Sequence, residues 1–288
     1  MKPRVSLPAH PRSDPGSPPP LQIVSYVFLL VLLVIVIFPF YWMTVTSLKS
    51  ETQMRSLTSM FWPRPAILDN YRQLVTQTDF GAWYGNSVTV ALTSTFLATA
   101  IGTIGAYSLA RLRYRGRAFM ASGVLITYLV PPSILFIPLY AHIRNIGLSN
   151  SLSGLIATYP SFTVPFVTWL LMGYFESIPE ELEEAAMIDG ATRLQTFARA
   201  VLPMVRGGMA ATAVLCFIFS WTEFLLSLFL TNSIRTLPVK ITTFVTSTGS
   251  EWGFIAALGT SAIVPSFIFI LLVQKQLVRG LTFGSLKE

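Results

Sequence analysis

The sequence predicts an all-α polytopic membrane protein with six spanning helices. Only 11% of its 288 residues are charged, 52% are hydrophobic, and the mean hydropathy is +0.61. A soluble domain carries about 25% charged residues, so this chain has too little charge to cover a water-facing surface. Apolar stretches long enough to cross a bilayer, about 20 residues each, separate its charged segments. The formal charge of +7 is dispersed between these stretches, which fits basic loops at an anionic membrane and argues against nucleic-acid binding.

Residues 1–20 are rich in proline and carry several basic side chains. We interpret them as a disordered cytoplasmic tail. A cleaved signal peptide is the alternative, but the apolar run that follows is too long for one and no small-residue cleavage site follows it. Residues 21–280 are expected to form the transmembrane domain, and residues 281–288 a C-terminal cytoplasmic tail.

Six stretches are long enough to span the membrane. The first is free of charge from Pro15 to Leu48 and is most apolar over Leu21–Met43. The others are Asn86–Ala110, Ala118–Ala141, Leu152–Phe175, Gly207–Leu230 and Phe254–Val273. Prolines are expected to bend the third and fourth spans, although spanning helices also tolerate proline. These prolines are Pro131, Pro132, Pro138, Pro160 and Pro165.

Lysine and arginine are unevenly divided between the two sides that these spans define. The side that holds both chain ends carries 13 of the 20 basic residues, including four arginines between Arg111 and Arg117. Because short basic loops stay in the cytoplasm, both termini are predicted to be cytoplasmic. No internal repeat is evident, so a secondary transporter built from repeats receives no support.

The polar segment between the fourth and fifth spans, residues 177–204, reads as two short helices joined by glycine. Pro179 suits a first helical position, and four glutamates follow in the first turns, where the helix dipole favours anions. Gly190 fits a left-handed helix stop. Thr192 is a candidate N-cap of the second helix, and Pro203 is expected to end that helix.

One face of the first short helix is formed by small residues. Four positions recur at the spacing i, i+3, i+4 and i+7 of a single helical face, and they are Leu182, Ala185, Ala186 and Asp189. Such a face is suited to close docking into a groove of another protein. An ordinary amphipathic loop at the membrane surface explains the same spacing, so periodicity alone leaves both interpretations open.

The residue order in this loop resembles the "EAA" loop of ABC importer permeases. Glu184-Ala185-Ala186 is followed four residues later by Gly190, and Leu202-Pro203 lies at the far end. It is most similar to the second permease of maltose-type carbohydrate importers, whose loop commonly reads Pro-x-x-Leu-x-Glu-Ala-Ala-x-x-Asp-Gly-Ala. The matching positions are Pro179, Leu182, Glu184, Ala185, Ala186, Asp189, Gly190 and Ala191. The resemblance covers the chain from about Pro39 to its end.

The resemblance implies a type I ABC importer permease fold in the cell membrane of a prokaryote. In that family the helix before the glycine sits in a cleft of the ATPase subunit and transmits its closure to the membrane helices. This implies a coupling role for Leu182, Glu184, Ala185, Ala186, Asp189, Gly190, Leu202 and Pro203.

The family also implies which partners to expect. They are a second, different permease subunit, a dimer of ATPase subunits that uses ATP and magnesium, an extracytoplasmic binding protein or lipoprotein, and membrane lipid. The expected substrate is a di- or oligosaccharide, and glycerol-phosphate-type compounds are the alternative.

Glu223 places a carboxylate inside the fifth span, about 25 Å along a helix that starts near Gly207. A charge there is costly unless it faces water or the protein interior. One interpretation puts Glu223 on the substrate path, with Trp221 as a stacking face for a sugar ring. The other is a structural hydrogen bond to a neighbouring helix or to the partner permease, and both remain open.

No sequence pattern assigns catalysis to the chain. It has no phosphate-binding Gly-x-x-x-x-Gly-Lys-Ser/Thr, so ATP hydrolysis is expected in a separate subunit, and no cofactor is expected here. One cysteine, Cys216, and two distant histidines argue against a disulfide and a metal site. Two alternatives are less well supported. An ion-coupled secondary transporter would require several carboxylates within its spans, and only Glu223 is present. A membrane transferase would require acidic or histidine clusters at one membrane face, and the only acidic cluster lies in the 177–204 loop.

Overall fold

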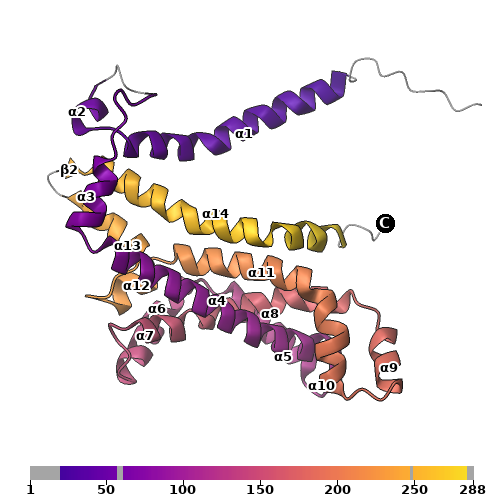
Figure 1. The fold of residues 1–288 in the computed structure, drawn as a ribbon. Coiled ribbons are helices and arrows are strands. Elements are labelled where there is room, and N and C mark those ends of the chain that lie inside the picture. The colour runs from indigo at the N-terminus through magenta and orange to yellow at the C-terminus, as the bar shows by residue number, and fades with distance from the viewer. Residues whose placement is uncertain (1–19, 57–60, 247–248, 284–288) are drawn as a thin grey trace, which may run out of the picture.

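The computed structural model describes residues 20–56, 61–246 and 249–283, and almost all of its elements are helices (Figure 1). Long helices run roughly side by side, and short helices gather at the two ends of the bundle. The tail predicted over residues 1–20 lies outside the described residues except for Pro20, where the first helix begins. Residues 284–288 also lie outside them, and the last helix runs to Phe283.

Five helices of the described residues are long and apolar enough to cross a membrane, and a bent pair adds a sixth span if it is counted as one. The bent pair is α5 (Arg117–Leu129) with α6 (Pro132–Asn145). The other spans are α1 (Pro20–Ser47), α4 (Phe80–Arg111), α7 (Leu152–Thr158) with α8 (Pro160–Glu176), α10 (Arg193–Thr196) with a π-helix (Phe197–Val201) and α11 (Leu202–Thr222), and α14 (Trp252–Phe283).

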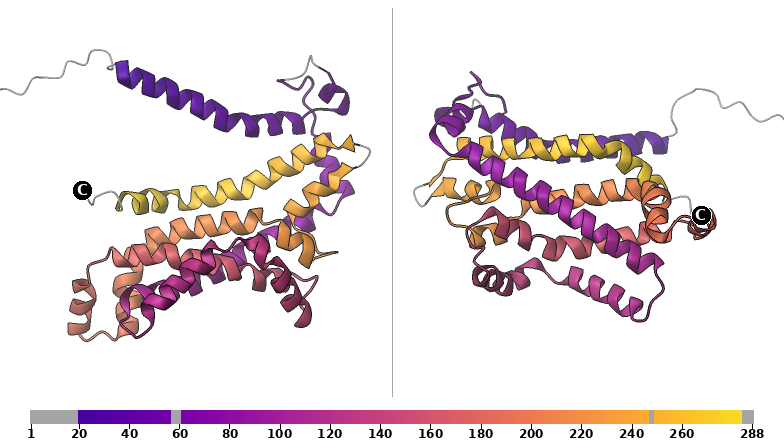
Figure 2. Two further views of the ribbon diagram at one scale, coloured as in Figure 1. Left: turned by 180° about the vertical axis from the view of Figure 1, so that it is seen from behind. Right: turned by 60° about the horizontal axis from the view of Figure 1, so that its bottom comes forward.

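The two ends of the bundle hold different short elements, as Figures 1 and 2 show. One end, the α9 end, holds α9 (Glu181–Ile188), and the start of α1, the end of α4 and the end of α14 lie at the same end of the bundle. The opposite α3 end is formed by α2 (Glu51–Met54), α3 (Asp69–Gln77), α12 (Leu225–Leu230), α13 (Leu237–Ile241), a 3₁₀-helix (Thr242–Phe244) and the antiparallel pair β1 (Val245–Thr246) and β2 (Gly249–Ser250). The start of the first span, α1, and the end of the last span, α14, therefore lie at the same end of the bundle as the arginine-rich α4–α5 connection, as the charge distribution predicted.

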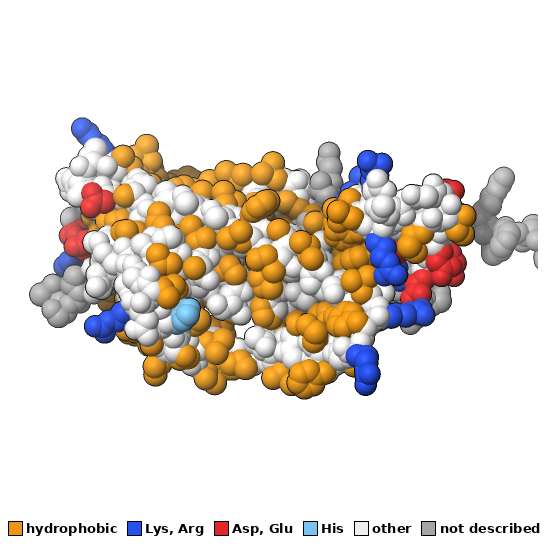
Figure 3. Space-filling view, turned by 90° about the horizontal axis from the view of Figure 1, so that it is seen from below, with side chains coloured by type: hydrophobic (Ala, Val, Ile, Leu, Met, Phe, Trp, Pro, Cys, Tyr) orange, Lys and Arg blue, Asp and Glu red, His pale blue; other side chains and the backbone are white. Residues whose placement is uncertain are grey.

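On the face drawn in Figure 3, charged side chains gather at the two ends of the bundle. Figure 3 shows lysine, arginine and acidic side chains at the two ends of one face, with a broad band of apolar and uncharged side chains between them. A band of this kind matches the hydrocarbon layer of a bilayer, in which an unpaired charge is costly.

The third predicted span is not one continuous helix. α5 ends at Leu129 and α6 begins at Pro132, and the two axes meet at 97°. The consecutive Pro131 and Pro132 explain the break, because proline lacks a backbone N–H and disfavours helical conformation in the residue before it. Proline was thus predicted to bend this span, and the bend is sharp enough to separate two helices.

The limits predicted for the fifth span were wrong at both ends. Its helix runs from Arg193 to Thr222, over 30 residues, rather than from Gly207 to Leu230. Pro203 does not end the preceding short helix, because it lies at the start of α11 directly after a π-helical segment, and such a local change of helix type accommodates the missing N–H of proline. A π-helical segment joins the short helix to the span without interruption.

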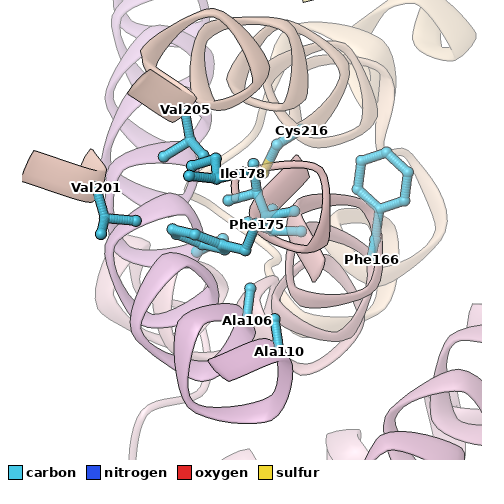
Figure 4. Packing of buried hydrophobic residues seen from close by; sticks show 11 residues of the cluster. Ala106, Ala110, Phe166, Phe175, Ile178, Val201, Val205 and Cys216 are labelled. Atoms are coloured by element: carbon cyan, nitrogen blue, oxygen red, sulfur yellow. The ribbon is translucent and has the colours of Figure 1, made fainter. Parts of the chain in front are cut away.

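Close packing of α4 on α8 forms the centre of the core. A Cβ atom at Gly102 would lie 2.5 Å from Cγ1 of Val167, so only glycine permits this approach of the two helices. Figure 4 shows the buried cluster that continues from here toward the α9 end, where Phe175 and Ile178 pack against Ala106 and Val201. This cluster connects α4, α8 and the π-helix directly beneath the loop that holds α9.

α1 is the least enclosed span. Every described side chain from Gln22 to Phe40 is exposed, and Phe40 packs edge-to-face on Phe267 of α14 with ring centroids 6.5 Å apart. An exposed apolar surface of this length is compatible with hydrocarbon or with another apolar chain, but not with water.

Candidate functional site

The loop over residues 177–204 forms the two short helices predicted from its sequence. Gly190 separates them with a φ of 90°, the left-handed conformation that favours glycine. Thr192 caps the second helix, since its Oγ1 accepts from the backbone N–H of Gln195 at 3.3 Å. The Gln195 side chain in turn accepts from the backbone N–H of Thr192 at 2.8 Å, which completes a capping box.

The outer surface of this loop carries large apolar side chains beside its exposed acidic ones, and no other part of the described chain covers them. α9 contains no buried residue, and Leu182 is 42% exposed. On either side of the glycine turn, Ile188 is 85% exposed and Leu194 is 76% exposed. Large apolar side chains at such exposure, at the charged end of the bundle, are typical of a surface that another protein covers.

The predicted coupling residues fall into two groups in space. Glu184, Ala185, Asp189 and Gly190 are exposed on α9 or on the turn after it, together with Leu182, and Ala186 is half-buried. Leu202 and Pro203 lie instead in the first turn of α11, where Leu202 packs half-buried against the core. The residues on α9 and its turn therefore lie on the surface of the loop, whereas Leu202 and Pro203 form the start of α11.

The inner side of α9 is held by charge. Oε1 of Glu183 lies 2.9 Å from Nε of Arg111, the last residue of α4, and Tyr107 donates its hydroxyl to Oε2 of Glu183 at 3.0 Å. Arg111 also donates to the carbonyl oxygen of Ile178, just before α9. The side chains of Arg111 and Glu183 are only 6% and 13% exposed. Burial strengthens such charge-assisted contacts relative to exposed ones.

A second ion pair lies beside the first in a different environment. Nη2 of Arg113 donates to Oε2 of Glu180 at 3.0 Å, with side chains 83% and 59% exposed. Water screens this pair, so its contribution to stability is small. An open cavity of about 260 Å³ lies between α4 and α9 and is lined by Arg111, Arg113, Arg193, Glu180, Glu183 and Glu184 among others.

Sequence reasoning missed four residues of this site: Arg111, Glu183, Ile188 and Leu194. The arginines between the second and third spans were used only to orient the chain, because nothing in their local pattern indicates a partner in the 177–204 loop. Ile188 and Leu194 fall outside the face defined by the i, i+3, i+4, i+7 spacing. A count of large apolar residues next to the glycine would have indicated them.

Glu223 lies where α11 stops and the chain turns. Its backbone is extended, with φ −63° and ψ 125°, and its carboxylate accepts from the backbone N–H groups of Leu226 at 2.7 Å and Ser227 at 3.1 Å. Tyr159 of α7–α8 donates its hydroxyl to Oε2 at 2.8 Å. The carboxylate thus caps α12 and connects it to α8, so its contacts are those of the structural interpretation.

Trp221 is enclosed by its own chain. It is 4% exposed, donates from Nε1 to the carbonyl oxygen of Ala262 at 3.1 Å, and stacks on Phe217 with centroids 5.8 Å apart. Tyr84 meets it edge-on at 6.0 Å. No ring face is open to a sugar in this conformation, so a substrate-path role for Trp221 stays a prediction that requires a different conformation.

Over the described ranges, no three His, Cys, Asp or Glu residues lie close enough together to hold a metal ion. Cys216 is buried in the core between α4, α8 and α11, and its thiol is free.

Residues 98–283 match the family described as "Binding-protein-dependent transport system inner membrane component". The sulfoquinovosyl glycerol transport permease of Agrobacterium fabrum is 37% identical over 259 residues, which cover 89% of this chain and 91% of that protein. The trehalose/maltose transport permease of Thermococcus litoralis is 32% identical over 271 residues, covering 92% and 97%.

A solved structure shows the same fold. A chain of a bacterial ABC transporter involved in import of the acidic polysaccharide alginate superposes with a TM-score of 0.76 and is 22% identical. The match covers 94% of this chain and 100% of that chain.

Proposed function

The chain belongs to the binding-protein-dependent transport system inner membrane components, and we propose that it is the permease subunit of an importer for a carbohydrate. As a member of this family it is a multi-pass inner-membrane permease of an ABC importer, and the ATPase is a separate subunit. The family name also places it in a complex with a substrate-binding protein.

The choice of a carbohydrate is supported by what the similar permeases are named for. Beside the two relatives above, a diacetylchitobiose uptake permease of Streptomyces coelicolor is 31% identical over 259 residues. All three names denote sugars or sugar conjugates, so a di- or oligosaccharide is the proposed substrate. A glycerol-phosphate-type compound is the alternative, and the ligand of the binding protein distinguishes the two.

The single observation that supports ATPase coupling is the exposed apolar surface of α9. Leu182, Ile188 and Leu194 surround the glycine turn at 42%, 85% and 76% exposure, in a loop whose inner side is fixed to the membrane helices. A short helix with this surface fits a groove of an ATPase subunit. We assign the coupling role to Leu182, Glu184, Ala185, Ala186, Asp189 and Gly190, with Leu202 and Pro203 at the start of the span that the loop moves.

The proposed mechanism is alternating access. The partner ATPases hold ATP and magnesium, and their closure displaces α9, which turns the cavity between two permeases outward to receive substrate from the binding protein. Hydrolysis returns the cavity inward. The exposed apolar length of α1, from Gln22 to Phe40, supports a second, different permease subunit and lipid as its neighbours.

Co-purification and reconstituted transport test this proposal. The chain, produced with its candidate second permease, ATPase and binding protein, is expected to retain the ATPase and to move a sugar into vesicles when ATP is supplied on the ATPase side. Ile188→Asp is expected to abolish retention of the ATPase, because a carboxylate would replace an apolar contact. Leu68→Asp at the α3 end, where the side chain is 67% exposed, is the matched control and is expected to retain it.

Two results would contradict the proposal. Purified chain that captures no ATPase would remove the coupling role. Vesicles that accumulate a substrate on an ion gradient without ATP would favour a secondary transporter instead.

A further inference from the structure

Arg111 is the point at which the α9 loop is fixed to a helix that is remote in sequence. It ends α4, yet its guanidinium contacts the loop at the carbonyl of Ile178 before α9 and at the carboxylate of Glu183 within α9, and it lies 3.9 Å from the carboxylate of Glu180. With 6% of its side chain exposed, Arg111 holds both contacts away from water. A planar guanidinium suits this arrangement, because it presents several donors in a fixed geometry.

α4 is also attached to the segment around the start of α13, at the opposite end of the molecule. Near the start of α4, Asn86 donates from Nδ2 to the carbonyl of Arg235 at 3.0 Å, and Oγ of Ser87 accepts from the backbone N–H of Leu237 at 2.7 Å. Leu237 begins α13, in the segment that follows the Glu223 break. From Ser87 to Arg111, α4 therefore spans roughly 36 Å between two polar attachments.

Displacement of α9 has two covalent routes into the membrane, through α8 before it and through α10 and the π-helix after it. The Arg111 contacts form a third route, which is not covalent and leads to α4. The close approach of Gly102 to Val167 leaves α4 little freedom to slide on α8, so a push at the end of α4 is expected to be transmitted along the helix.

We propose that Arg111 is a positioning residue of the coupling mechanism, which passes displacement of α9 through Glu183 to α4 and along α4 to the α13 segment. This inference rests on the proposed function, because α9 is displaced only if an ATPase docks on it. It assigns to the α4–α5 connection a mechanical role beyond its basic charge.

The neighbouring Arg113 provides the matched comparison. Arg113 lies two residues further along, also pairs with a glutamate of the loop at 3.0 Å, and is 83% exposed. Arg111→Met, Glu183→Gln and the double variant remove the buried contact, while Arg113→Met removes only the exposed one. Glu183→Gln keeps an acceptor for Tyr107, so it removes charge without removing the side chain.

The decisive measurement is the amount of substrate transported per ATP hydrolysed in vesicles that contain the whole complex. Arg111→Met and Glu183→Gln are expected to lower this ratio by roughly 5-fold or more, within the range of coupling between distant sites. The double variant is expected to lower it no further than Arg111→Met alone, because both changes break one contact. Arg113→Met is expected to keep the wild-type ratio.

Each result bears on the proposal. If Arg111 served folding alone, Arg111→Met would reduce transport and ATP hydrolysis in proportion and leave the ratio unchanged, which would overturn the inference. An Arg113→Met ratio as low as that of Arg111→Met would overturn it too, since exposure would then not matter. Wild-type chain that retains no ATPase would instead refute the proposed function, whatever the variants do.

Discussion

Tyr159 donates its hydroxyl to Oε2 of Glu223 at 2.8 Å, across the point where α11 ends and the chain turns into α12. The tyrosine is 1% exposed, and the two backbone N–H groups of Leu226 and Ser227 complete the partners of the carboxylate. Through these contacts Glu223 fixes the geometry of the break between α11 and α12.

Tyr159→Phe tests this structural role. The hydroxyl donates to a charged acceptor in a buried site, so its loss is expected to lower the free energy of unfolding by about 2 kcal/mol. Thermal unfolding of the purified complex in detergent measures it, and Tyr140→Phe on α6 controls for removal of a hydroxyl elsewhere. Unchanged stability with weakened substrate affinity would place the pair on the substrate path.

Gly102→Ala tests the contact between α4 and α8. The added Cβ would lie 2.5 Å from Val167, so the helices must separate, at an expected cost of about 1–3 kcal/mol. Gly85→Ala, in the same helix with nothing within 4 Å of its Cβ position, is expected to be neutral or stabilising by about 1 kcal/mol. Equal effects of the two substitutions on the unfolding temperature would show that α8 does not set the requirement for glycine.

Asn150 connects the α6–α7 loop to the turn after α12. Its Oδ1 accepts from the backbone N–H groups of Asn232 at 2.8 Å and Ser233 at 2.9 Å. Asn150→Asp keeps the acceptor and is expected to stay close to wild type, whereas Asn150→Ala is expected to lose about 1–2 kcal/mol. Limited proteolysis of the turn reports the loss.

A third variant separates the two reasons for asparagine at this position. The backbone of Asn150 has a φ of 54°, which asparagine and glycine tolerate better than alanine. Asn150→Gly therefore removes only the side-chain contacts. Proteolysis of Asn150→Gly at the wild-type rate would show that the backbone, and not the amide oxygen, holds the turn.

Gly190→Ala tests the turn after α9. A non-glycine residue in the left-handed conformation costs about 1–2 kcal/mol, so the loop is expected to change conformation and to reduce ATP-dependent transport. Gly147→Ala, at φ 75° in the α6–α7 loop, imposes the same backbone strain at the α3 end. Transport is measured for both at matched amounts of assembled complex, and an equal loss would indicate general instability instead of a role for the turn.

Local sequence pattern was sufficient to locate most of the spans and to predict the two helices of the 177–204 loop. A run of about 20 apolar residues is itself the physical requirement for crossing a bilayer, so composition locates most spans without tertiary contacts. Gly190 and Thr192 were predicted correctly because a left-handed stop and an N-cap depend on one to four neighbouring residues.

Periodicity and hydropathy failed where a partner is distant along the chain. The fifth span was extended to Leu230 because the residues after Glu223 are as apolar as those before it. The helix actually stops at Thr222, where Tyr159, 64 residues earlier, meets the carboxylate. The prediction that Pro203 ends the second short helix failed for a related reason: proline at a helix start and proline after a helix end look alike in sequence.

The sequence by itself therefore determined that the chain spans a membrane, which side carries the basic loops, and that residues 177–204 form two short helices joined by a glycine turn. These properties follow from transfer of side chains to hydrocarbon and from short-range backbone geometry. Only the tertiary structure decided that Glu223 caps a helix break and that Arg111 fixes α9 to α4. A charged group obtains its role from the groups that replace its water, and for Arg111 the carbonyl of Ile178 lies 67 residues away.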